Sequence, residues 1–250
     1  MVLGAGFGRR LRPLTLARPK PLAPFLGTTL IGWTIARLRR AGVGRIVVNT
    51  HYKAAMLEDR LRRDPRIHCL REPRILGTGG GVRNALPLLG AEPFLVCNAD
   101  AFWRDAPDGP GMLARLAAAW DGRRMDALLL LYPVSALPEV EGVRRPAGDY
   151  FMEAGGSGRP RRRRGGGRAP LLFAGVHILH PGLLRHLAVR PGIEFSLTRA
   201  WDAAEARGRL HAVIHDGDWF HLGDAASLTA AAAACRNLRI TAKPCGKGGS

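Results

Sequence analysis

Short apolar runs alternate along the chain with longer segments whose apolar residues recur at helical spacing. The short runs predict buried strands at residues 45–49, 93–97, 127–132, 171–173 and 176–179. The longer segments predict helices at residues 30–41, 53–63, 111–120, 196–207 and 224–236. The first of these helices has Thr28 or Thr29 as N-cap and Gly42 at its end. This alternation indicates an α/β fold around a largely parallel sheet.

With 250 residues, 46% of them hydrophobic, the chain can bury one large core, and the pattern assigns residues 1–236 to a single domain. Residues 1–3 form only the end of an expected first strand, so we expect that strand to be incomplete. Residues 155–169 combine glycines with repelling arginines and lack apolar anchors, which predicts a flexible, exposed insertion. Residues 237–250 show no periodicity and predict a disordered tail.

The formal net charge of +18 is typical of nucleic-acid-binding proteins, but nearly all of the positive charge comes from arginine. Only four of the 38 basic residues are lysine, and aromatic residues make up 6% of the chain. A nucleic-acid surface more often mixes both cations with stacking aromatics, so we do not expect nucleic acid as the main partner. The four cysteines lack metal-site spacing, which favours reduced thiols. Since no apolar segment is long enough for a signal peptide or a membrane span, we expect a cytoplasmic protein, monomeric or weakly oligomeric.

Residues 4–20 carry the densest candidate chemistry. Three glycines at residues 4–8 let the backbone approach a ligand and direct successive N–H groups at anionic oxygens. Three arginines at residues 9–12, and Lys20 between two prolines, add full positive charge. The spacing matches neither a Walker A loop nor the Gly-x-Gly-x-x-Gly dinucleotide loop. The segment therefore predicts a polyphosphate-binding site of another kind.

A second candidate position follows the strand predicted at residues 93–97. This strand delivers Asn98 and Asp100 to its carboxyl end, where ligands bind in open α/β sheets. A carboxylate is a hard oxygen ligand of the kind that Mg²⁺ prefers, so we expect Asp100 to lie in the site.

The run from Leu3 to Thr15, followed by residues 19–22, resembles the signature of the sugar-1-phosphate nucleotidyltransferases. Gly4 stands where the family signature has Ala. Further family-like motifs lie at residues 77–81, 84–90, 98–103, 148–151 and 173–181. These motifs are most similar to the N-acetylmuramate α-1-phosphate uridylyltransferases and then to the mannose-1-phosphate guanylyltransferases. The resemblance spans about residues 1–228 and implies the nucleotide-diphospho-sugar transferase fold, a Rossmann-like three-layer α/β/α sandwich with a mixed, mostly parallel sheet.

The resemblance implies transfer of a nucleotidyl group from a nucleoside triphosphate to a sugar-1-phosphate, giving a nucleotide sugar and pyrophosphate. UTP and N-acetylmuramate α-1-phosphate are the favoured pair, which implies peptidoglycan recycling. GTP and mannose-1-phosphate are the alternative. Because the attacking phosphate oxygen is already anionic, the chemistry needs charge stabilisation rather than a general base.

The resemblance also implies roles for individual residues. It assigns catalysis to Arg10, which stabilises the departing pyrophosphate, and to Lys20, which holds the two phosphates together. It assigns nucleotide binding to Gly4, Ala5, Gly6, Gly8, Arg10, Gly77, Thr78, Gly79 and Asn98. It assigns sugar-phosphate binding to Asp149, Phe173, Gly175 and Glu194. Residues 77–81 are expected to form a glycine turn that reads the base through backbone groups, and Asp100 is the expected Mg²⁺ ligand.

The chain departs from the family pattern at the second metal carboxylate, where His221 stands. Imidazole is a poor Mg²⁺ ligand, so either Asp100 suffices together with the phosphates, or Asp216, Asp218 or Asp224 substitutes for the missing carboxylate. His221 itself is expected to line the site. This departure leaves open a catalytically weakened homologue that still binds nucleotides. A further class, an RNA-binding protein acting through the arginines at 159–168, predicts steeply salt-dependent binding.

Overall fold

We describe the computed structural model for residues 1–106, 109–138, 145–153, 158–190 and 192–237. Its centre is a nine-stranded mixed sheet in which β10 and β11 run against the other strands. One path through the sheet has the order β10-β9-β11-β6-β1-β4-β5, and β8 joins β11 to β12. These strands are β1 (Val2–Leu3), β4 (Ile46–Thr50), β5 (Ile67–Arg71), β6 (Phe94–Asn98), β8 (Ala127–Pro133), β9 (Tyr150–Met152), β10 (Pro160–Arg162), β11 (Leu171–Leu179) and β12 (Leu210–Ile214).

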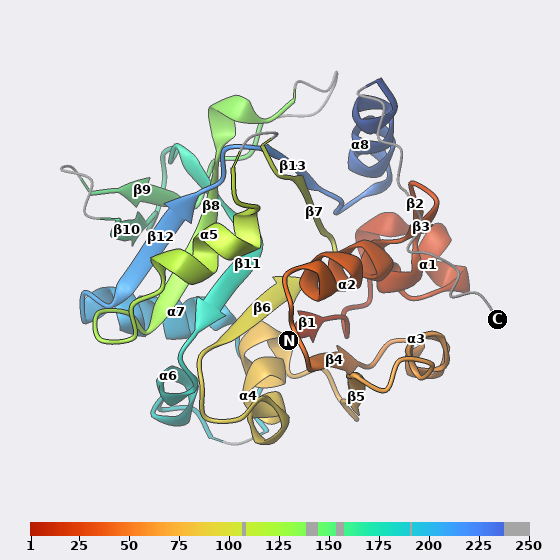
Figure 1. Cartoon of the computed structure of the whole chain (residues 1–250), viewed down its shortest axis with the longest axis horizontal. Helices are drawn as coiled ribbons and strands as arrows, with labels where there is room; N and C mark the ends of the chain where they lie inside the picture. The colour runs from red at the N-terminus through yellow and green to blue at the C-terminus, as the bar shows by residue number, and fades with distance from the viewer. Residues whose placement is uncertain (107–108, 139–144, 154–157, 191, 238–250) are drawn as a thin grey trace.

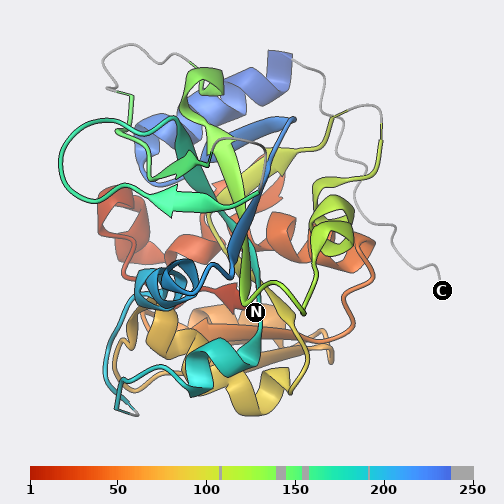
Figure 2. The same cartoon turned by 90° about the vertical axis from the view of Figure 1, so that its left-hand side faces the viewer.

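Helices cover both faces of the sheet, which gives the expected three layers (Figures 1 and 2). One face packs against α2 (Leu30–Arg40), α3 (Ala54–Leu61) and α5 (Met112–Ala119). The other face packs against α4 (Gly77–Leu89), α6 (Pro181–Arg185) and α7 (Leu197–Ala206). The predicted α/β fold with a mixed, mostly parallel sheet is therefore confirmed. No helix among the described residues has the length and apolarity to cross a bilayer.

Two small sheets and the last helix lie beside this core. One pairs β7 (Ala101–Arg104) with β13 (Asp218–His221), antiparallel, and the other pairs β2 (Pro24–Phe25) with β3 (Thr28–Thr29). Helix α8 (Ala225–Asn237) packs with them in a third apolar cluster around Phe102 and Phe220. The short helix α1 (Leu14–Ala17) and the 3₁₀ turns at Arg9–Leu11, Lys20–Leu22 and Val134–Ala136 complete the described elements.

The helices expected from apolar periodicity form within one or two residues of their predicted ends. Thr29, rather than Thr28, caps α2, since its Oγ1 accepts the Gly32 N–H at 3.2 Å. The two strands expected at residues 171–179 are one strand, β11, with an irregularity between Phe173 and His177. Gly175 lies inside it with a φ of +80°, a left-handed conformation that glycine adopts without strain.

Two predictions differ from the structure. Residues 77–81 form the first turns of α4 rather than a turn before a helix. The insertion at 155–169 is not a loop throughout, because Pro160–Arg162 form β10, paired antiparallel with β9. Arg162 explains the order there, since its guanidinium donates twice to the Asp202 carboxylate on α7, each time at 2.6 Å. The predicted tail beyond residue 237 and part of the insertion lie outside the described residues.

Candidate active site

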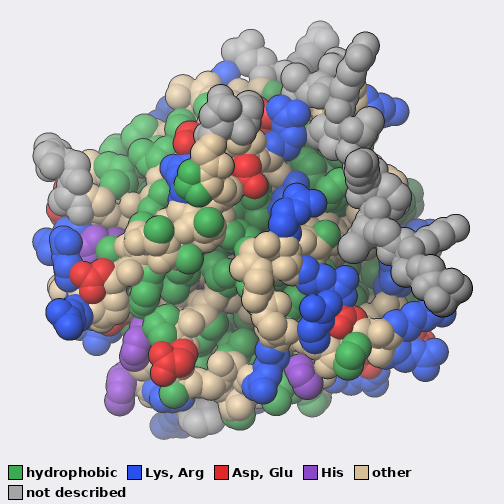
Figure 3. Space-filling model, in the orientation of Figure 1, with side chains coloured by type: hydrophobic (Ala, Val, Ile, Leu, Met, Phe, Trp, Pro, Cys, Tyr) green, Lys and Arg blue, Asp and Glu red, His purple; other side chains and the backbone are tan. Residues whose placement is uncertain are grey.

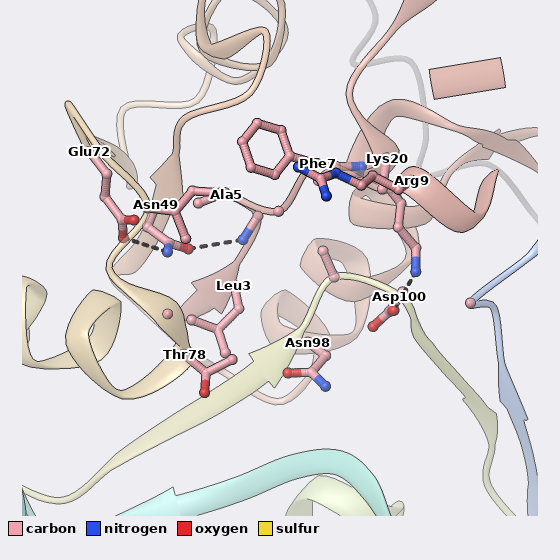
Figure 4. Close-up of a pocket in the computed structure, with 18 of the residues that line it drawn as sticks. Leu3, Ala5, Phe7, Arg9, Lys20, Asn49, Glu72, Thr78, Asn98 and Asp100 are labelled. Carbon is pink, nitrogen blue, oxygen red and sulfur yellow. Dashed lines mark hydrogen bonds and ion pairs between the residues drawn. The ribbon is translucent and has the colours of Figure 1, made fainter. Parts of the chain in front are cut away.

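A cavity of about 440 Å³ lies at the carboxyl ends of β1, β4 and β6 (Figure 4). Its walls are residues 3–10, Lys20 and Pro21, Asn49, Glu72 and Ile75, Gly77 and Thr78, residues 98–100 and Gly223. Three parallel strands therefore end at one place, as expected for a ligand site in an α/β sheet. Of the predicted site residues, all those on the nucleotide and metal side except Gly79 and His221 line this cavity.

The loop after β1 presents unused hydrogen-bond donors to the cavity. The Gly4 N–H donates to Asn49 Oδ1 at 2.9 Å, which anchors the start of the loop. The four amides of residues 5–8 donate to no acceptor within the described part of the chain. Gly6 has open space where a side chain would stand. Successive free amides of this kind form an anion-binding concavity.

Gly8 is required by the local geometry. Its φ is +62°, and a Cβ there would lie 2.8 Å from the Cβ of Lys20. The glycine thus lets the loop turn and pack directly against the segment that carries Lys20. Thr15 reinforces the turn by donating from its Oγ1 to the Gly8 carbonyl at 3.0 Å.

Three cations approach this loop. Lys20 Nζ lies 2.6 Å from Asp100 Oδ2, and the two side chains are only 15% and 20% exposed. Figure 4 shows this pair on the side of the cavity opposite Asn49 and Glu72.

The exposed Arg10 also lines the cavity, and its guanidinium has no ion-pair partner among the described residues. Arg9 lines the cavity as well, with its guanidinium 5.0 Å over the Phe7 ring. The site therefore holds one lysine–aspartate pair and two arginines that have no ion-pair partner among the described residues.

The glycines of α4 divide into two groups. Gly77 and Thr78 line the cavity, and their amides have no acceptor in the described chain. Gly79 faces away: its N–H donates to the Phe195 carbonyl at 2.9 Å, and a Cβ on it would lie 2.3 Å from the Phe195 ring. Backbone reading of a base is thus available at the first two positions, while Gly79 serves close packing.

Asn49 and Glu72, which are both buried in the cavity wall, are absent from the residues predicted from the sequence. Figure 4 shows Asn49 bridging the phosphate loop and Glu72. An asparagine near a strand end and a carboxylate just after a strand are both common in sequences. Only the hydrogen bond between them in the folded protein identifies these two as residues of the site. The one sequence signal for Glu72 is its place directly after an apolar strand, the same kind of position that predicts Asp100.

His221 is brought beside Asp100 by strand pairing. It stands opposite Ala101 in the β7–β13 ladder, and the Leu222 N–H donates to the Asp100 carbonyl at 3.3 Å. The pKa of His221 lies below its ordinary value, mainly because nearby protein atoms displace water from the ring, with Lys20 and Arg10 adding to the shift against Asp100. A neutral imidazole contributes no negative charge for a metal ion.

The proposed substitutes for the second carboxylate are already engaged. Asp216 pairs with Arg115, and Asp218 pairs with Arg104. Asp224 caps the start of α8, where it accepts from the Ser227 N–H and hydroxyl, both at 2.8 Å. Among these three, only Asp224 acts electrostatically on His221. No cluster of three or more histidine, cysteine, aspartate or glutamate side chains suited to a metal exists in the described residues.

The residues predicted to hold the sugar phosphate do not line the cavity. Asp149 Oδ2 accepts the Phe173 N–H at 2.9 Å, and the Phe173 ring packs on Trp201 at a centroid distance of 4.6 Å. Glu194 is exposed, beside Gly77. Gly175 likewise borders a residue of the cavity wall, since a Cβ on it would lie 3.2 Å from Asn98 Nδ2.

A family model for nucleotidyl transferases matches residues 1–137. The chain is also 39% identical over 241 residues to an N-acetylmuramate α-1-phosphate uridylyltransferase of Caulobacter vibrioides, covering 93% of this chain and 95% of that protein. The chain belongs to the nucleotidyl transferase family. The free amides of residues 5–8, Arg10 and Lys20, which line one cavity, are compatible with this assignment.

Two further similarities extend this nucleotidyl transferase assignment. A mannose-1-phosphate guanyltransferase of Aspergillus fumigatus is 30% identical over 237 residues, covering 89% of this chain and 60% of that protein. A crystal structure of UDP-glucose pyrophosphorylase with UDP-glucose superposes with a TM-score of 0.76 at 19% identity, over 95% of this chain and 98% of that one. The structural similarity confirms the nucleotide-diphospho-sugar transferase fold.

On the face that Figure 3 shows, the charge of this nucleotidyl transferase is not concentrated in one patch. In Figure 3 the basic side chains lie in several separate groups, with acidic side chains among them. Within the arginine-rich insertion, Arg163 donates from Nε to the Gly148 carbonyl at 2.8 Å, and Arg164 lies 3.4 Å from Glu205. Arginines committed to such intramolecular contacts favour a structural role over RNA binding.

Proposed function

We propose that this chain transfers a uridylyl group from UTP to N-acetylmuramate α-1-phosphate. A phosphate oxygen of the sugar attacks the α-phosphorus and forms the new P–O bond, while the bond from the α-phosphorus to the bridging β-phosphate oxygen breaks. The products are UDP-N-acetylmuramate and pyrophosphate. The attacking oxygen is already an anion, so no side chain has to remove a proton.

One observation carries this proposal: the free amides of residues 5–8, Arg10 and Lys20 converge on one wall of the cavity. The amides suit the β- and γ-phosphate oxygens, and Arg10 suits the charge that builds on the departing pyrophosphate. Lys20, as a compact point charge on a flexible stem, suits bridging the α-phosphate and the incoming sugar phosphate. Gly77 and Thr78 face the base and ribose.

The protein ligands in the cavity are too few to hold Mg²⁺ alone, so the ion fits only when the phosphates of the substrate also coordinate it. Asp100 and Glu72 are the two carboxylates that line the cavity among the described residues, and both oxygens of Glu72 already accept hydrogen bonds, from Asn49 and from the Leu76 N–H. Asp100 is therefore the carboxylate that fits a metal ion. Mg²⁺ commonly takes one or two carboxylates, with phosphates and waters completing its shell. We propose that Asp100 holds an ion that arrives with the triphosphate. When bound, the ion would neutralise phosphate charge.

The choice of substrates rests on the relatives. A relative named for uridylyl transfer to N-acetylmuramate α-1-phosphate covers nearly the whole chain, which favours UTP, this sugar and a role in peptidoglycan recycling in the cytoplasm. The mannose-1-phosphate guanyltransferase relative makes GTP with mannose-1-phosphate the second candidate. Unpaired Cys69, Cys97 and Cys235 are compatible with a reducing compartment.

The test is pyrophosphate release by the purified protein with Mg²⁺, across UTP, GTP, CTP and dTTP against a panel of sugar-1-phosphates. We expect turnover with UTP and N-acetylmuramate α-1-phosphate, lowered by at least about 10²-fold in Lys20→Ala and Asp100→Asn. Turnover with GTP and mannose-1-phosphate instead would establish the second candidate. Nucleotide binding with no turnover across the panel would indicate a weakened homologue and refute the proposal.

A further inference from the structure

Asn49 and Glu72 form a buried polar pair between the two halves of the nucleotide site. Asn49 lies on β4 and Glu72 directly follows β5, and they are 3% and 2% exposed. Asn49 Oδ1 accepts the Gly4 N–H at 2.9 Å, and Asn49 Nδ2 donates to Glu72 Oε1 at 2.7 Å. Glu72 Oε2 accepts the Leu76 N–H at 3.2 Å. Three hydrogen bonds in series thus join Gly4 to Leu76.

The two ends of this series are the starts of the two ligand-facing segments. Gly4 opens the phosphate loop, and Leu76 directly precedes Gly77, whose amide faces the cavity. The packing of α4 leaves room for the pair, since a Cβ on Gly81 would lie 2.7 Å from Asn49 Nδ2 and 2.8 Å from Glu72 Oε1. The series therefore fixes the phosphate loop relative to the start of α4.

The directions of the hydrogen bonds make the residue types specific. Both carboxylate oxygens of Glu72 accept, and the backbone N–H groups at the two ends can only donate. Asn49 supplies the one acceptor and one donor that connect them. A buried donor left without an acceptor costs more than an average hydrogen bond contributes, so the series tolerates no simple amide-for-acid exchange.

We propose that Asn49 and Glu72 are positioning residues that set nucleotide affinity through the Gly4 and Leu76 amides. This inference rests on the proposed function only in requiring that the cavity take a nucleoside triphosphate. It goes beyond that function by coupling triphosphate binding to the base-facing end of α4.

The experiment measures the Kd of UTP with Mg²⁺ by calorimetry, without sugar phosphate, so that no turnover occurs. In Glu72→Gln the new amide NH₂ faces either Asn49 Nδ2 or the Leu76 N–H. Because two hydrogen-bond donors then face each other, we expect UTP to bind about tenfold more weakly. Asn49→Asp sets two carboxylates face to face, and we expect at least as large a loss. The double variant Asn49→Asp/Glu72→Gln reverses the middle hydrogen bond, restores all three and keeps the net charge, so binding should return to within about threefold of wild type.

Thr50→Val is the matched control. It removes another hydrogen bond from the same strand, Thr50 Oγ1 to Glu58 Oε1 at 2.6 Å, outside the cavity. We expect it to lower the Tm but leave the Kd of UTP unchanged. Wild-type affinity in Glu72→Gln, or a folded double variant as weak as the single variants, would overturn the inference. If the double variant does not fold, the Kd of UTP in Glu72→Gln is compared with that in Thr50→Val. Equal Kd values in these two variants would overturn the inference. Absence of nucleotide binding by the wild type would refute the proposed function instead.

Discussion

The phosphate side and the predicted sugar side of the site differ in whether their polar groups already have hydrogen-bond partners within the protein. On the phosphate side, the amides of residues 5–8 and the Arg10 guanidinium have no partner among the described residues. On the sugar side, the Asp149 carboxylate accepts a backbone N–H of β11, and Phe173 packs in the core. Donors held in place without acceptors indicate a ligand, whereas satisfied groups indicate structure.

The same contrast separates the glycines. Gly6 faces open space, while Gly8 and Gly79 are pressed against Lys20 and Phe195. A glycine motif in the sequence thus contains two kinds of position. At one kind the missing side chain leaves room for a ligand, and at the other it leaves room for a neighbouring side chain of the protein. Substitutions can tell the two kinds apart, because only the second kind destabilises the fold.

The largest effect is expected from Lys20→Ala. It removes the cation that lies 2.6 Å from Asp100, and we expect kcat in the pyrophosphate-release assay to fall by about 10²–10³-fold. Lys53, the other lysine among the described residues, does not line this cavity and is the matched control. Lys53→Ala should stay within about twofold of wild type. Equal losses in both variants would mean that general positive charge, rather than the position of Lys20, supports the reaction.

We expect Gly8→Ala to lower the stability of the fold and Gly6→Ala to weaken UTP binding without lowering stability. An alanine at position 8 must adopt a φ near +62° and lie against Lys20, so we expect a loss of at least about 1–2 kcal/mol in the free energy of unfolding. At position 6 we expect stability to change by less than about 0.5 kcal/mol, and UTP to bind roughly tenfold more weakly because a methyl group crowds the phosphates. Denaturant titration and calorimetry measure the two effects. A stable Gly8→Ala variant would contradict the distinction.

We expect His221→Asp to strengthen the binding of Mg²⁺ in the site. Position 221 lies opposite Ala101, next to Asp100, and a carboxylate there supplies a hard oxygen ligand in place of imidazole. We expect the Mg²⁺ concentration for half-maximal activity to fall by about fivefold to tenfold. His221→Asn, which is neutral, is the control and should leave the Mg²⁺ requirement near wild type. No change in either variant would show that Asp100 and the phosphates alone set the metal affinity.

Much of the fold was predictable because apolar periodicity and caps are local signals. The ends of α2, α5 and α7 followed from them within one or two residues. The arginine-rich insertion was not predictable, since its order depends on Asp202, a residue 40 positions from Arg162. Composition alone showed repulsion among like charges and could not show the acidic helix face that offsets it.

The site divides in the same way. Gly6, Gly8, Arg10 and Lys20 lie close together in the sequence, so their pattern was visible as one motif. Asn49 and Glu72 were missed because their function depends on meeting across β4 and β5. Gly79 was assigned to the base although its N–H serves Phe195, a contact between residues 116 positions apart that no local pattern contains.

Asp149→Asn should have the smallest effect and gives the sharpest test of the sugar side. Its carboxylate accepts the Phe173 N–H at 2.9 Å, and an asparagine Oδ1 can accept the same bond. We therefore expect the KM for the sugar-1-phosphate to stay within about twofold of wild type. Asp149→Ala, which removes the acceptor, should cost about 1–3 kcal/mol of stability and likewise spare the KM. A KM raised about tenfold in Asp149→Asn, with an unchanged Tm, would place this carboxylate on the substrate. The contrast between the two sides would then fail, because a group satisfied by the protein's own backbone would also be binding a ligand.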